Sequence, residues 1–346
     1  VLNILNFQTL IATKARRMRY VSGERLLVDF GLRRAQGLGG YHASRAAFIG
    51  GFNATSNVYS GMKFGIPVSG TMAHSFIQSY DNELSAFQDF AKYNPDNCVL
   101  LVDTYDTLNS GIPNSIKIAH EMEKRGQRLK AVRLDSGDLA YFSRKSRKML
   151  DDEGLSYVKI AASNSLDEYL IKSLIEQNAP IDLFGVGTSI ITGQKDAALD
   201  GVYKLSYLND EPKIKLSENP SKTIIPCKKQ VFRMISEEDS FYGADCVSLN
   251  DENDPQIMHH PFEPEKSLDI SGLKKEPLLH PVMKNGKRTT DLKHASDIQK
   301  FSNERFERLP DEYKRFENPH VYKVGLSSDL HLKRSLLIEK MKRSLQ

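Results

Sequence analysis

Short apolar runs recur at fairly regular intervals through the first two thirds of the chain, and each breaks off into a polar cluster. Runs this short between helical stretches are typical of buried parallel strands. In α/β sheets and barrels the active site lies at the carboxyl ends of the strands. Polar tails after six strands therefore predict one shared site. The six runs occupy residues 26–30, 66–68, 99–102, 129–132, 158–161 and 181–184.

The segments between these runs have helical periodicity. Strand, helix and strand joined by short links give right-handed crossovers, and hence a parallel sheet or barrel. About 180 residues, from Leu26 to Lys204, are therefore expected to be α/β. The expected helices cover residues 2–15, 44–62, 74–92, 114–124, 139–150 and 166–176.

Beyond Tyr203 the pattern changes to alternation with period two, as in half-exposed antiparallel strands. We expect strands at 202–205, 213–216 and 230–233, a loop at 250–266, and helices at 295–309 and 332–345. The chain starts at Val1 with a helix already in progress, and so resembles a piece of a longer protein. The predicted domains are a helical lead-in left from an amino-terminal domain (1–24), a β/α-barrel catalytic domain (25–205), and an α+β region that packs with the missing amino-terminal part (206–346).

Composition narrows the class of protein. The chain has 48 basic and 44 acidic residues, and the net charge of +4 does not itself favour nucleic-acid binding. Cys98, Cys227 and Cys246 are too few and too dispersed for a disulfide framework or a four-ligand zinc site, which favours a reduced, cytoplasmic setting. No apolar stretch approaches the ~20 residues that span a bilayer, and no signal peptide is evident.

Two of the tails favour an anionic ligand. Gly185-Val186-Gly187-Thr188 ends the sixth run, and its glycines allow backbone amides to approach a phosphate, although a plain tight turn is the other interpretation. Arg33, Arg34 and Arg133 follow the first and fourth runs and suit bidentate recognition of phosphate or carboxylate. Alternatively, these arginines form internal salt bridges with acidic residues.

Acidic residues follow the third and fourth runs. Asp135, Ser136 and Asp138 form a compact turn whose carboxylates suit Mg²⁺ or ribose hydroxyls. For Asp138, capping of the following helix is the favoured alternative. The Asp103-Thr104-Tyr105-Asp106 tail is equally ambiguous, and structural hydrogen bonding is somewhat favoured there.

His74 follows Ser69-Gly70-Thr71 at an expected helix start, where Thr71 is a candidate cap. A histidine in such a place is commonly a structural hydrogen bonder. Beside an anion site it could instead be a general base, a metal ligand or a nucleophile toward a phosphoryl group. These residues alone predict a β/α-barrel enzyme acting on a phosphorylated, sugar-containing substrate.

The amino-acid sequences of the tails closely resemble those of the nicotinate phosphoribosyltransferase family. The resemblance runs from about Leu2 to the carboxyl end and includes several long motifs in the family's order. These motifs are Phe30-Gly31-Leu32-Arg33-Arg34-Ala35-Gln36-Gly37, Gly50-Gly51-Phe52-Asn53-Ala54-Thr55-Ser56-Asn57, Ser69-Gly70-Thr71-Met72-Ala73-His74-Ser75-Phe76, Leu101-Val102-Asp103-Thr104-Tyr105-Asp106-Thr107, Val132-Arg133-Leu134-Asp135-Ser136-Gly137-Asp138-Leu139 and Phe184-Gly185-Val186-Gly187-Thr188.

The resemblance implies an α/β fold, namely an irregular, incomplete β/α barrel with a second α+β region, assembled as a cytoplasmic homodimer with shared active sites. It implies a glycosyltransferase reaction of NAD biosynthesis (Preiss–Handler salvage), in which nicotinate and phosphoribosyl pyrophosphate give nicotinate mononucleotide and pyrophosphate. It also implies Mg²⁺ and a ligase-type coupling to ATP hydrolysis, through a phosphoprotein intermediate at His74.

The same resemblance assigns roles to residues. Phe30 packs on the pyridine ring, Arg33 and Arg133 serve the pyrophosphate, phosphate or nicotinate carboxylate, and Asp135 faces the ribose and the Mg²⁺-pyrophosphate. Asn164 faces the ribose hydroxyls, and Gly187 with Thr188 the 5′-phosphate. His74, Arg133 and Asp135 are the expected catalytic residues, and the other expected substrate-binding residues are Arg34, Ser56, Ser75, Ser136, Ser163 and Gly185.

By this resemblance, Ser56 occupies the position at which the sister family that uses nicotinamide has an acidic residue. Without that acid an arginine is free to pair with the carboxylate of the substrate, which favours nicotinate over nicotinamide. The chain departs from the family at Ser165, at Asp200-Gly201 and at Cys227, and lacks the early helix whose tyrosine reaches the partner's site. Two other hypotheses are a catalytically silent fragment that binds phosphoribosyl pyrophosphate or dimerises, and, less favoured, a nucleic-acid binder using the lysines between Lys213 and Arg233.

Overall fold

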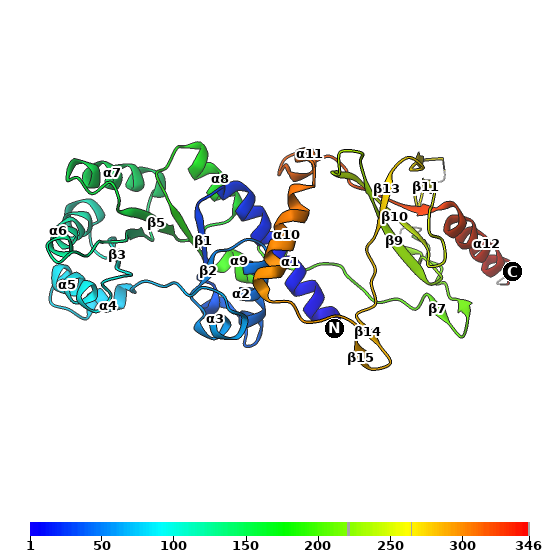
Figure 1. The fold of residues 1–346 in the computed structure, drawn as a ribbon, viewed down its shortest axis with the longest axis horizontal. Helices are drawn as coiled ribbons and strands as arrows, with labels where there is room; N and C mark the ends of the chain where they lie inside the picture. Colours follow the sequence, from blue (N-terminus) through cyan, green and yellow to red (C-terminus); the bar gives the residue numbers. More distant parts are fainter. Residues whose placement is uncertain (220–221, 264, 345–346) are drawn as a thin grey trace. The chain divides into compact units, whose positions relative to one another are not determined.

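The computed structural model describes residues 1–219, 222–263 and 265–344. The chain divides into two compact units (Figure 1). Unit 1 comprises Val1–Gly201 with Lys293–Ser302, and unit 2 comprises Val202–Leu292 with Asn303–Gln346. Among the described residues, no helix is long and apolar enough to cross a membrane.

Unit 1 is built on a parallel sheet with the strand order β2-β1-β6-β5-β4-β3. β1 pairs with β2 on one side and β6 on the other, while β2 and β3 form the two edges and do not pair. The described residues therefore form an open, incomplete barrel, and the predicted fold class is confirmed. The strands are β1 (Leu26–Asp29), β2 (Ala54–Thr55), β3 (Val99–Leu101), β4 (Ala131–Leu134), β5 (Lys159–Ser163) and β6 (Leu183–Val186).

The second strand differs from its prediction. The expected run at 66–68 makes only an isolated bridge, between Val68 and Thr55, and the strand of the sheet is β2. Pro67 accepts a hydrogen bond from Thr55 but has no N–H to return one, so the pairing cannot lengthen there.

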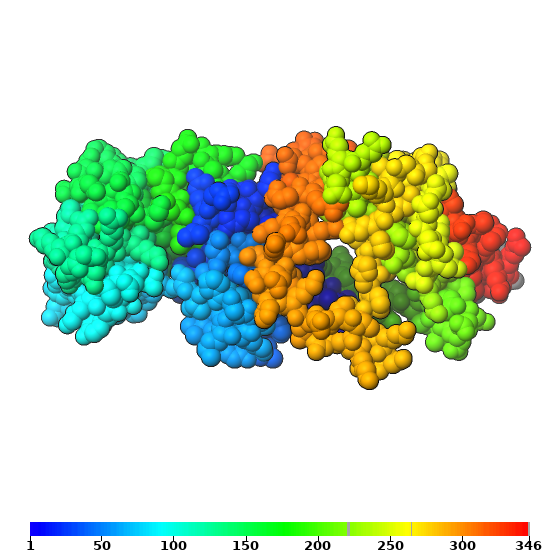
Figure 2. Space-filling model, viewed as in Figure 1, coloured from blue at the N-terminus to red at the C-terminus, as the bar shows by residue number. Residues whose placement is uncertain are grey.

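Helices cover the sheet, and α4 to α7 form a continuous cyan-to-green surface in the space-filling view (Figure 2). Gly50, at the end of α2, allows α1 to approach closely, because a Cβ there would lie 2.5 Å from the Ala12 carbonyl oxygen. The helices of unit 1 are α1 (Leu2–Ser22), α2 (Gly39–Ile49), α3 (Val58–Phe64), α4 (His74–Gln78), α5 (Glu83–Tyr93), α6 (Ile112–Glu123), α7 (Leu139–Asp152), α8 (Glu168–Glu176) and α9 (Thr188–Thr192).

Two predicted helices are wrong because each is two helices. The segment 44–62 is interrupted after α2, where Gly51 has φ +118° and the chain turns into β2. The segment 74–92 breaks between α4 and α5, and the Asn82 side chain caps the new helix at the Ser85 N–H. Helical periodicity continued across both breaks, so only the local turn chemistry marked them.

Unit 2 is a mostly antiparallel sheet with the order β12-β11-β16-β10-β9-β13, in which only β10 and β16 run parallel. Its apolar cluster includes Met234, Ala244 and Cys246. The strands are β9 (Lys229–Ile235), β10 (Phe241–Leu249), β11 (Ile257–His259), β12 (Ser267–Asp269), β13 (Lys274–Pro277) and β16 (Lys323–Ser327), with the small pairs β7 (Tyr207–Leu208) and β8 (Glu211–Pro212), and β14 (Met283–Lys284) and β15 (Lys287–Arg288). The helices of unit 2 are α11 (Asp311–Lys314) and α12 (Ser328–Ser344), while α10 (Ala295–Glu307) begins in the unit 1 segment Lys293–Ser302 and ends in unit 2.

The prediction for unit 2 is partly wrong. Residues 230–233 lie in β9, but 202–205 and 213–216 are not strands, since alternation alone does not supply a neighbouring strand to pair with. The expected loop 250–266 contains β11. The expected helices match α10 and α12 within a few residues. Residue 264 of the expected loop and residue 345 of the last expected helix lie outside the described part of the chain.

Candidate active site

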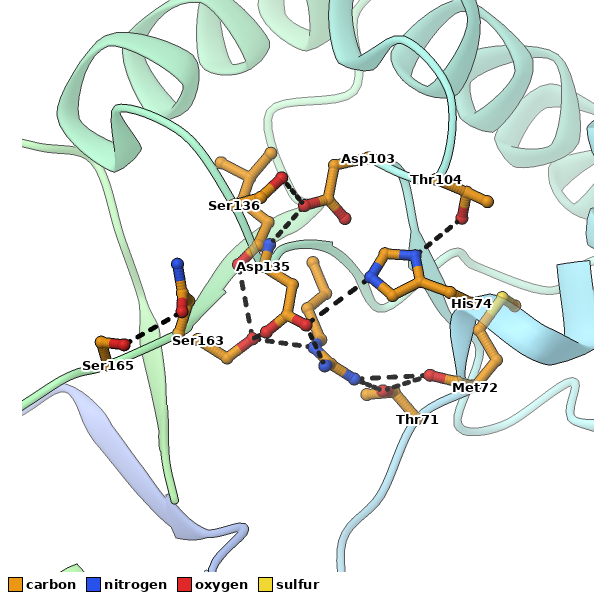
Figure 3. A network of polar contacts seen from close by, with 12 residues as sticks. Thr71, Met72, His74, Asp103, Thr104, Asp135, Ser136, Ser163 and Ser165 are labelled. Carbon is orange, nitrogen blue, oxygen red and sulfur yellow. Dashed lines mark hydrogen bonds and ion pairs between the residues drawn. The ribbon is translucent and has the colours of Figure 1, made fainter. Parts of the chain in front are cut away.

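Residues from three neighbouring strand ends and one loop meet at the carboxyl edge of the unit 1 sheet (Figure 3). They come from the loop before α4 and from the ends of β3, β4 and β5. The participants are Thr71, Met72, His74, Asp103, Thr104, Arg133, Asp135, Ser136 and Ser163. The structure thus brings together His74, which follows the second run, and Arg133 and Asp135, which both follow the fourth.

Arg133 is the centre of this network, and 15% of its side chain is exposed. Its Nε donates to Ser163 Oγ at 2.9 Å and its Nη1 to Thr71 Oγ1 at 2.5 Å. Its Nη2 lies 3.3 Å from Asp135 Oδ2. Two donors therefore reach neutral hydroxyls, and Nη1 also lies 3.4 Å from the Met72 carbonyl oxygen, so the guanidinium is oriented while much of its charge remains available for an anion.

Asp135 connects the arginine to the histidine. Its Oδ1 accepts a 2.5 Å hydrogen bond from Ser163, and its Oδ2 faces both Arg133 and His74 Nε2, the latter at 3.6 Å. Exposed fractions of 25% for the Asp135 side chain and 39% for His74 leave both accessible to a ligand.

The tail after β3 supplies two residues whose roles the sequence left open. Asp103 Oδ2 accepts from the Asp135 backbone N–H at 2.9 Å and from Ser136 Oγ at 2.6 Å, which fixes the turn after β4. Thr104 Oγ1 lies 3.0 Å from His74 Nδ1. Sequence reasoning missed Thr104 and Thr71 as site residues because a threonine carries no charge to single it out; their position in the tails was the available signal.

Phe30 lies between Gly185 and Arg133. A Cβ on Gly185 would come within 2.3 Å of the Phe30 ring, and the Arg133 guanidinium carbon lies 5.4 Å from the ring centroid on a cation–π contact. Gly185 therefore makes room for the aromatic ring, which is a packing reason for a glycine that the sequence assigned to phosphate binding.

Arg33 and Arg34 lie in the short helix Leu32–Arg34 directly after β1 and are exposed. Within the described parts of the chain neither forms an ion pair, so the salt-bridge alternative applies to Arg133 but not to them. Ser56 is half-buried, and its N–H donates to the Asp29 carbonyl at 2.8 Å, placing it beside the end of β1.

The remaining predicted residues are less tightly connected. Ser75 is exposed on α4, and Asn164 follows β5 at φ +93° with its Oδ1 accepting from Ser165 at 3.2 Å. Gly187 precedes α9, and Thr188 is its first residue. Non-glycine residues at positive φ cluster at functional sites, and here Asn164 and Ser165 are two in succession.

Two polar residues of the tails are caps, and a third, Thr71, is not the cap that the sequence predicted. Asp138 caps α7 through the Tyr141 N–H, and Asp106 accepts from Leu108 and Asn109 at the turn before α6, so the structural interpretation is confirmed for both. Thr71 does not cap α4, because the residue before that helix is Ala73 and the Thr71 hydroxyl contacts Arg133 instead.

In the described part of the chain, no group of three or more His, Cys, Asp or Glu side chains is arranged to hold a metal ion. Within the network of Figure 3, one carboxylate oxygen, Asp103 Oδ1, is buried without a hydrogen-bond partner. A separate cavity of about 920 Å³ opens at the opposite, amino ends of the strands, lined by residues such as Leu26, Lys130 and Lys159. It contains none of the network's residues, so the carboxyl edge remains the candidate active site.

Comparison with known proteins agrees with this fold. The profile of the nicotinate phosphoribosyltransferase (NAPRTase) family matches residues 26–264, and that of the nicotinate phosphoribosyltransferase C-terminal domain matches residues 228–334. The nicotinate phosphoribosyltransferase of Bacillus subtilis is 44% identical over 338 residues, covering 95% of this chain and 69% of the relative. That of Caenorhabditis elegans is 35% identical, covering 96% and 70%.

Solved structures are similar as well. Human nicotinic acid phosphoribosyltransferase superposes with a TM-score of 0.84 at 27% identity, covering 97% of this chain and 75% of the human one. A nicotinate-nucleotide pyrophosphorylase from Pyrococcus furiosus has a TM-score of 0.71 at 25% identity, with coverages of 89% and 72%. The fold is therefore one that a phosphoribosyltransferase of known structure shares. The chain belongs to the nicotinate phosphoribosyltransferase family.

Proposed function

We propose that this protein transfers the phosphoribosyl group of phosphoribosyl pyrophosphate to nicotinate, giving nicotinate mononucleotide and pyrophosphate for NAD biosynthesis, with ATP hydrolysis coupled through His74. The observation that carries the proposal is the convergence of His74, Arg133 and Asp135 at one edge of the sheet in a chain of this family.

The charges in the site suit such a transfer. The breaking C1–O bond leaves positive, oxocarbenium-like charge on the ribose and negative charge on pyrophosphate. A carboxylate near the sugar with an arginine at the leaving group stabilises that separation. Asp135 and Arg133 are held 3.3 Å apart by Ser163 and Thr71, and are therefore placed before substrate arrives.

Nicotinate recognition is assigned to the end of β1. Phe30 offers a ring for the pyridine to pack on, and the exposed Arg33 and Arg34 offer charge for its carboxylate. Ser56 adds no negative charge, which suits an anionic ring substrate better than an amide. Asn164 is assigned to the ribose hydroxyls, and Gly187 with Thr188 to the 5′-phosphate; Ser75, Ser136 and Ser163 complete the polar lining.

Magnesium fits the same edge. Asp103 Oδ1 is the buried oxygen without a partner, while both oxygens of Asp135 have partners, so these two carboxylates would hold the ion mainly through water and pyrophosphate. When bound, Mg²⁺ would neutralise part of the negative charge that develops on the pyrophosphate leaving group.

His74 is assigned the acceptance of a phosphoryl group from ATP. The bond between the terminal phosphorus and its bridging oxygen breaks, ADP leaves with the electron pair, and a ring nitrogen forms the new P–N bond. Later attack by water breaks that bond and releases phosphate. The imidazole is partly exposed and adjacent to Asp135, so its state can affect the site where pyrophosphate is expected.

We also infer a cytoplasmic homodimer with shared sites. Exposed apolar side chains gather on α3, with Tyr59 48% and Met62 82% exposed, shortly after Ser56 in the chain. All three cysteines are buried and free, which suits a reducing compartment.

Nicotinate mononucleotide formation by this 346-residue chain, with and without ATP, tests the proposal. We expect product in both reactions and more with ATP. His74→Ala should reduce the ATP stimulation to none while some ATP-independent turnover remains. No product under any condition, together with retained binding of phosphoribosyl pyrophosphate, would instead support the silent-fragment hypothesis, and full ATP stimulation in His74→Ala would exclude a phosphohistidine at this position.

A further inference from the structure

One carboxyl group is buried at the end of β1, directly before the segment 30–34 that is assigned to nicotinate. The side chain belongs to Asp29, which is 1% exposed. In the described part of the chain, every hydrogen bond to its carboxyl oxygens comes from a neutral group. A buried carboxyl group is tolerated only while its oxygens are hydrogen-bonded, so its position is tied to that of its donors.

The two oxygens of Asp29 bind different elements. Oδ1 accepts from the Gly31 backbone N–H at 2.8 Å, within segment 30–34. Oδ2 accepts from Thr55 Oγ1 on β2 at 2.8 Å and from Ser44 Oγ on α2 at 2.7 Å. The carboxyl group therefore joins the segment after β1 to the neighbouring strand β2 and to α2.

Gly31 determines where the following arginines begin. Its carbonyl accepts from the Arg34 N–H at 2.8 Å and closes the short turn that carries Arg33. A Cβ on Gly31 would lie 2.7 Å from the Ile191 Cβ and 3.1 Å from the Gly187 carbonyl oxygen, so this backbone is closely packed. A change in the bond to the carboxyl group would therefore be passed on to the arginines.

Ser56 is connected to the same carboxyl group through its neighbours in the chain. Thr55 is the register partner of Asp29, and the Ser56 N–H donates to the Asp29 carbonyl at 2.8 Å. Asn57 is buried, and it donates to Thr55 Oγ1 at 3.0 Å from its backbone and to Ser44 Oγ at 3.2 Å from its side chain. Both neighbours of Ser56 thus belong to one buried hydrogen-bonded group.

We propose that Asp29 is a positioning residue of the nicotinate site, which holds segment 30–34 and Ser56 in a fixed relation to each other; this rests on the proposed function. The buried carboxyl group has no access to a substrate, so it acts only through the groups that it binds. Among the described residues, it shares no hydrogen bond with the network around Arg133, where phosphoribosyl pyrophosphate is expected. Its loss should therefore weaken the binding of nicotinate more than that of phosphoribosyl pyrophosphate.

Asp29→Asn tests this role at nearly constant shape. Asparagine accepts at one oxygen only, because its amide nitrogen is a donor, so it can serve either Gly31 or the hydroxyls of Thr55 and Ser44. We expect KM for nicotinate to rise about tenfold, while KM for phosphoribosyl pyrophosphate stays within about threefold. An unchanged KM for nicotinate, or equal rises for the two substrates, would overturn the inference.

Glu83→Gln is the matched control. Glu83 is also buried, and its carboxyl group accepts from Ser110 Oγ at 2.5 Å and from Asn114 at 2.9 Å, but it lies on α5. We expect both KM values of this variant to stay within about twofold of the wild type. If Asp29→Asn does not fold, Ser44→Ala removes a single donor to Oδ2 and should raise KM for nicotinate about threefold. A selective rise in KM for nicotinate in Glu83→Gln, or none in Ser44→Ala, counts against the inference.

Equilibrium binding of ¹⁴C-labelled nicotinate separates this inference from the reaction. If the wild-type chain binds nicotinate but forms no nicotinate mononucleotide, the proposed function fails. Weaker binding by Asp29→Asn than by Glu83→Gln then still supports the positioning role, and equal binding by the two variants overturns it. A wild-type chain that binds no nicotinate overturns the assignment of this site together with the inference.

Discussion

Each unit contains an arginine–aspartate pair beside an aromatic ring, and the two pairs are built differently. In unit 2, Arg233 and Asp245 are direct partners across β9 and β10 and are joined by two hydrogen bonds of 3.0 and 2.9 Å. Tyr322 donates a third bond to Asp245 at 2.8 Å. In unit 1, Arg133 and Asp135 share one contact of 3.3 Å. Their short hydrogen bonds are made instead with the hydroxyl groups of Ser163 and Thr71.

This difference distinguishes a structural ion pair, Arg233–Asp245, from a pair in the candidate active site, Arg133–Asp135. The hydrogen bonds to Asp245 raise the pKa of Arg233 above its ordinary value, and burial followed by the bond to Asp245 raises the pKa of Tyr322. Such a pair is satisfied within the protein. The Arg133 pair is oriented by neutral side chains, so a ligand can take over the charge interactions without leaving the protein groups unpaired.

The largest expected effect is that of Arg133→Ala. We expect kcat/KM for nicotinate mononucleotide formation to fall on the order of a thousandfold, because a preorganised donor to developing charge is lost. The unfolding midpoint should change little, since the partners of Arg133 are mostly neutral and partly exposed. Steady-state kinetics and denaturant unfolding on the same preparation measure both. A large loss of stability with activity retained would make this pair structural as well.

Arg233→Met tests the other side of the comparison. It leaves Asp245 without its partner, and we expect the free energy of unfolding to fall by about 2 kcal/mol, given that both side chains are only partly exposed. Activity per folded molecule should stay within about twofold. A selective fall in kcat/KM at unchanged stability would contradict the contrast.

Gly185→Ala tests whether the position of the Phe30 ring depends on the absence of a side chain at residue 185. The added Cβ would lie 2.3 Å from the ring, so Phe30 must move. We expect KM for nicotinate to rise about tenfold, as for loss of part of an aromatic contact, with a smaller change in KM for phosphoribosyl pyrophosphate. Gly70→Ala is a suitable control, since nothing lies within 4 Å of a Cβ there. Equal shifts for both substrates would return Gly185 to a phosphate-binding role.

The smallest effect concerns alkaline pH. Because the pKa of Tyr322 is raised by folding, the unfolded chain releases this proton first, and stability falls as pH rises above about 10. Tyr322→Phe should reduce that fall by at most about 1.4 kcal/mol per pH unit. Denaturant midpoints between pH 9 and 11 measure it. A steeper fall in the variant would be inconsistent with the bond to Asp245.

The capping residues and the broken helices show how far local sequence signals reach. Asp138 and Asp106 are caps because a side chain that bonds its own next turn needs no distant partner. The break between α4 and α5 was missed, although Asn82 carries the same kind of signal, because apolar periodicity continues across it. In unit 2, strands 202–205 and 213–216 failed because pairing depends on a neighbour elsewhere in the chain.

By itself the sequence determined which polar tails follow the six apolar runs, five of which form strands of the sheet, and which family those tails resemble. The sequence is sufficient for this because strand periodicity, helix capping and sequence motifs each depend on residues that are close together in the chain. Only the tertiary structure decided that Arg133 is held by Thr71 and Ser163, and that Thr104 contacts His74. Those contacts follow from the order β5-β4-β3 and from the path of the loop before α4, which join residues far apart in the chain. Tails at the same edge of a sheet can be listed from sequence, but which of them touch depends on which strands are neighbours.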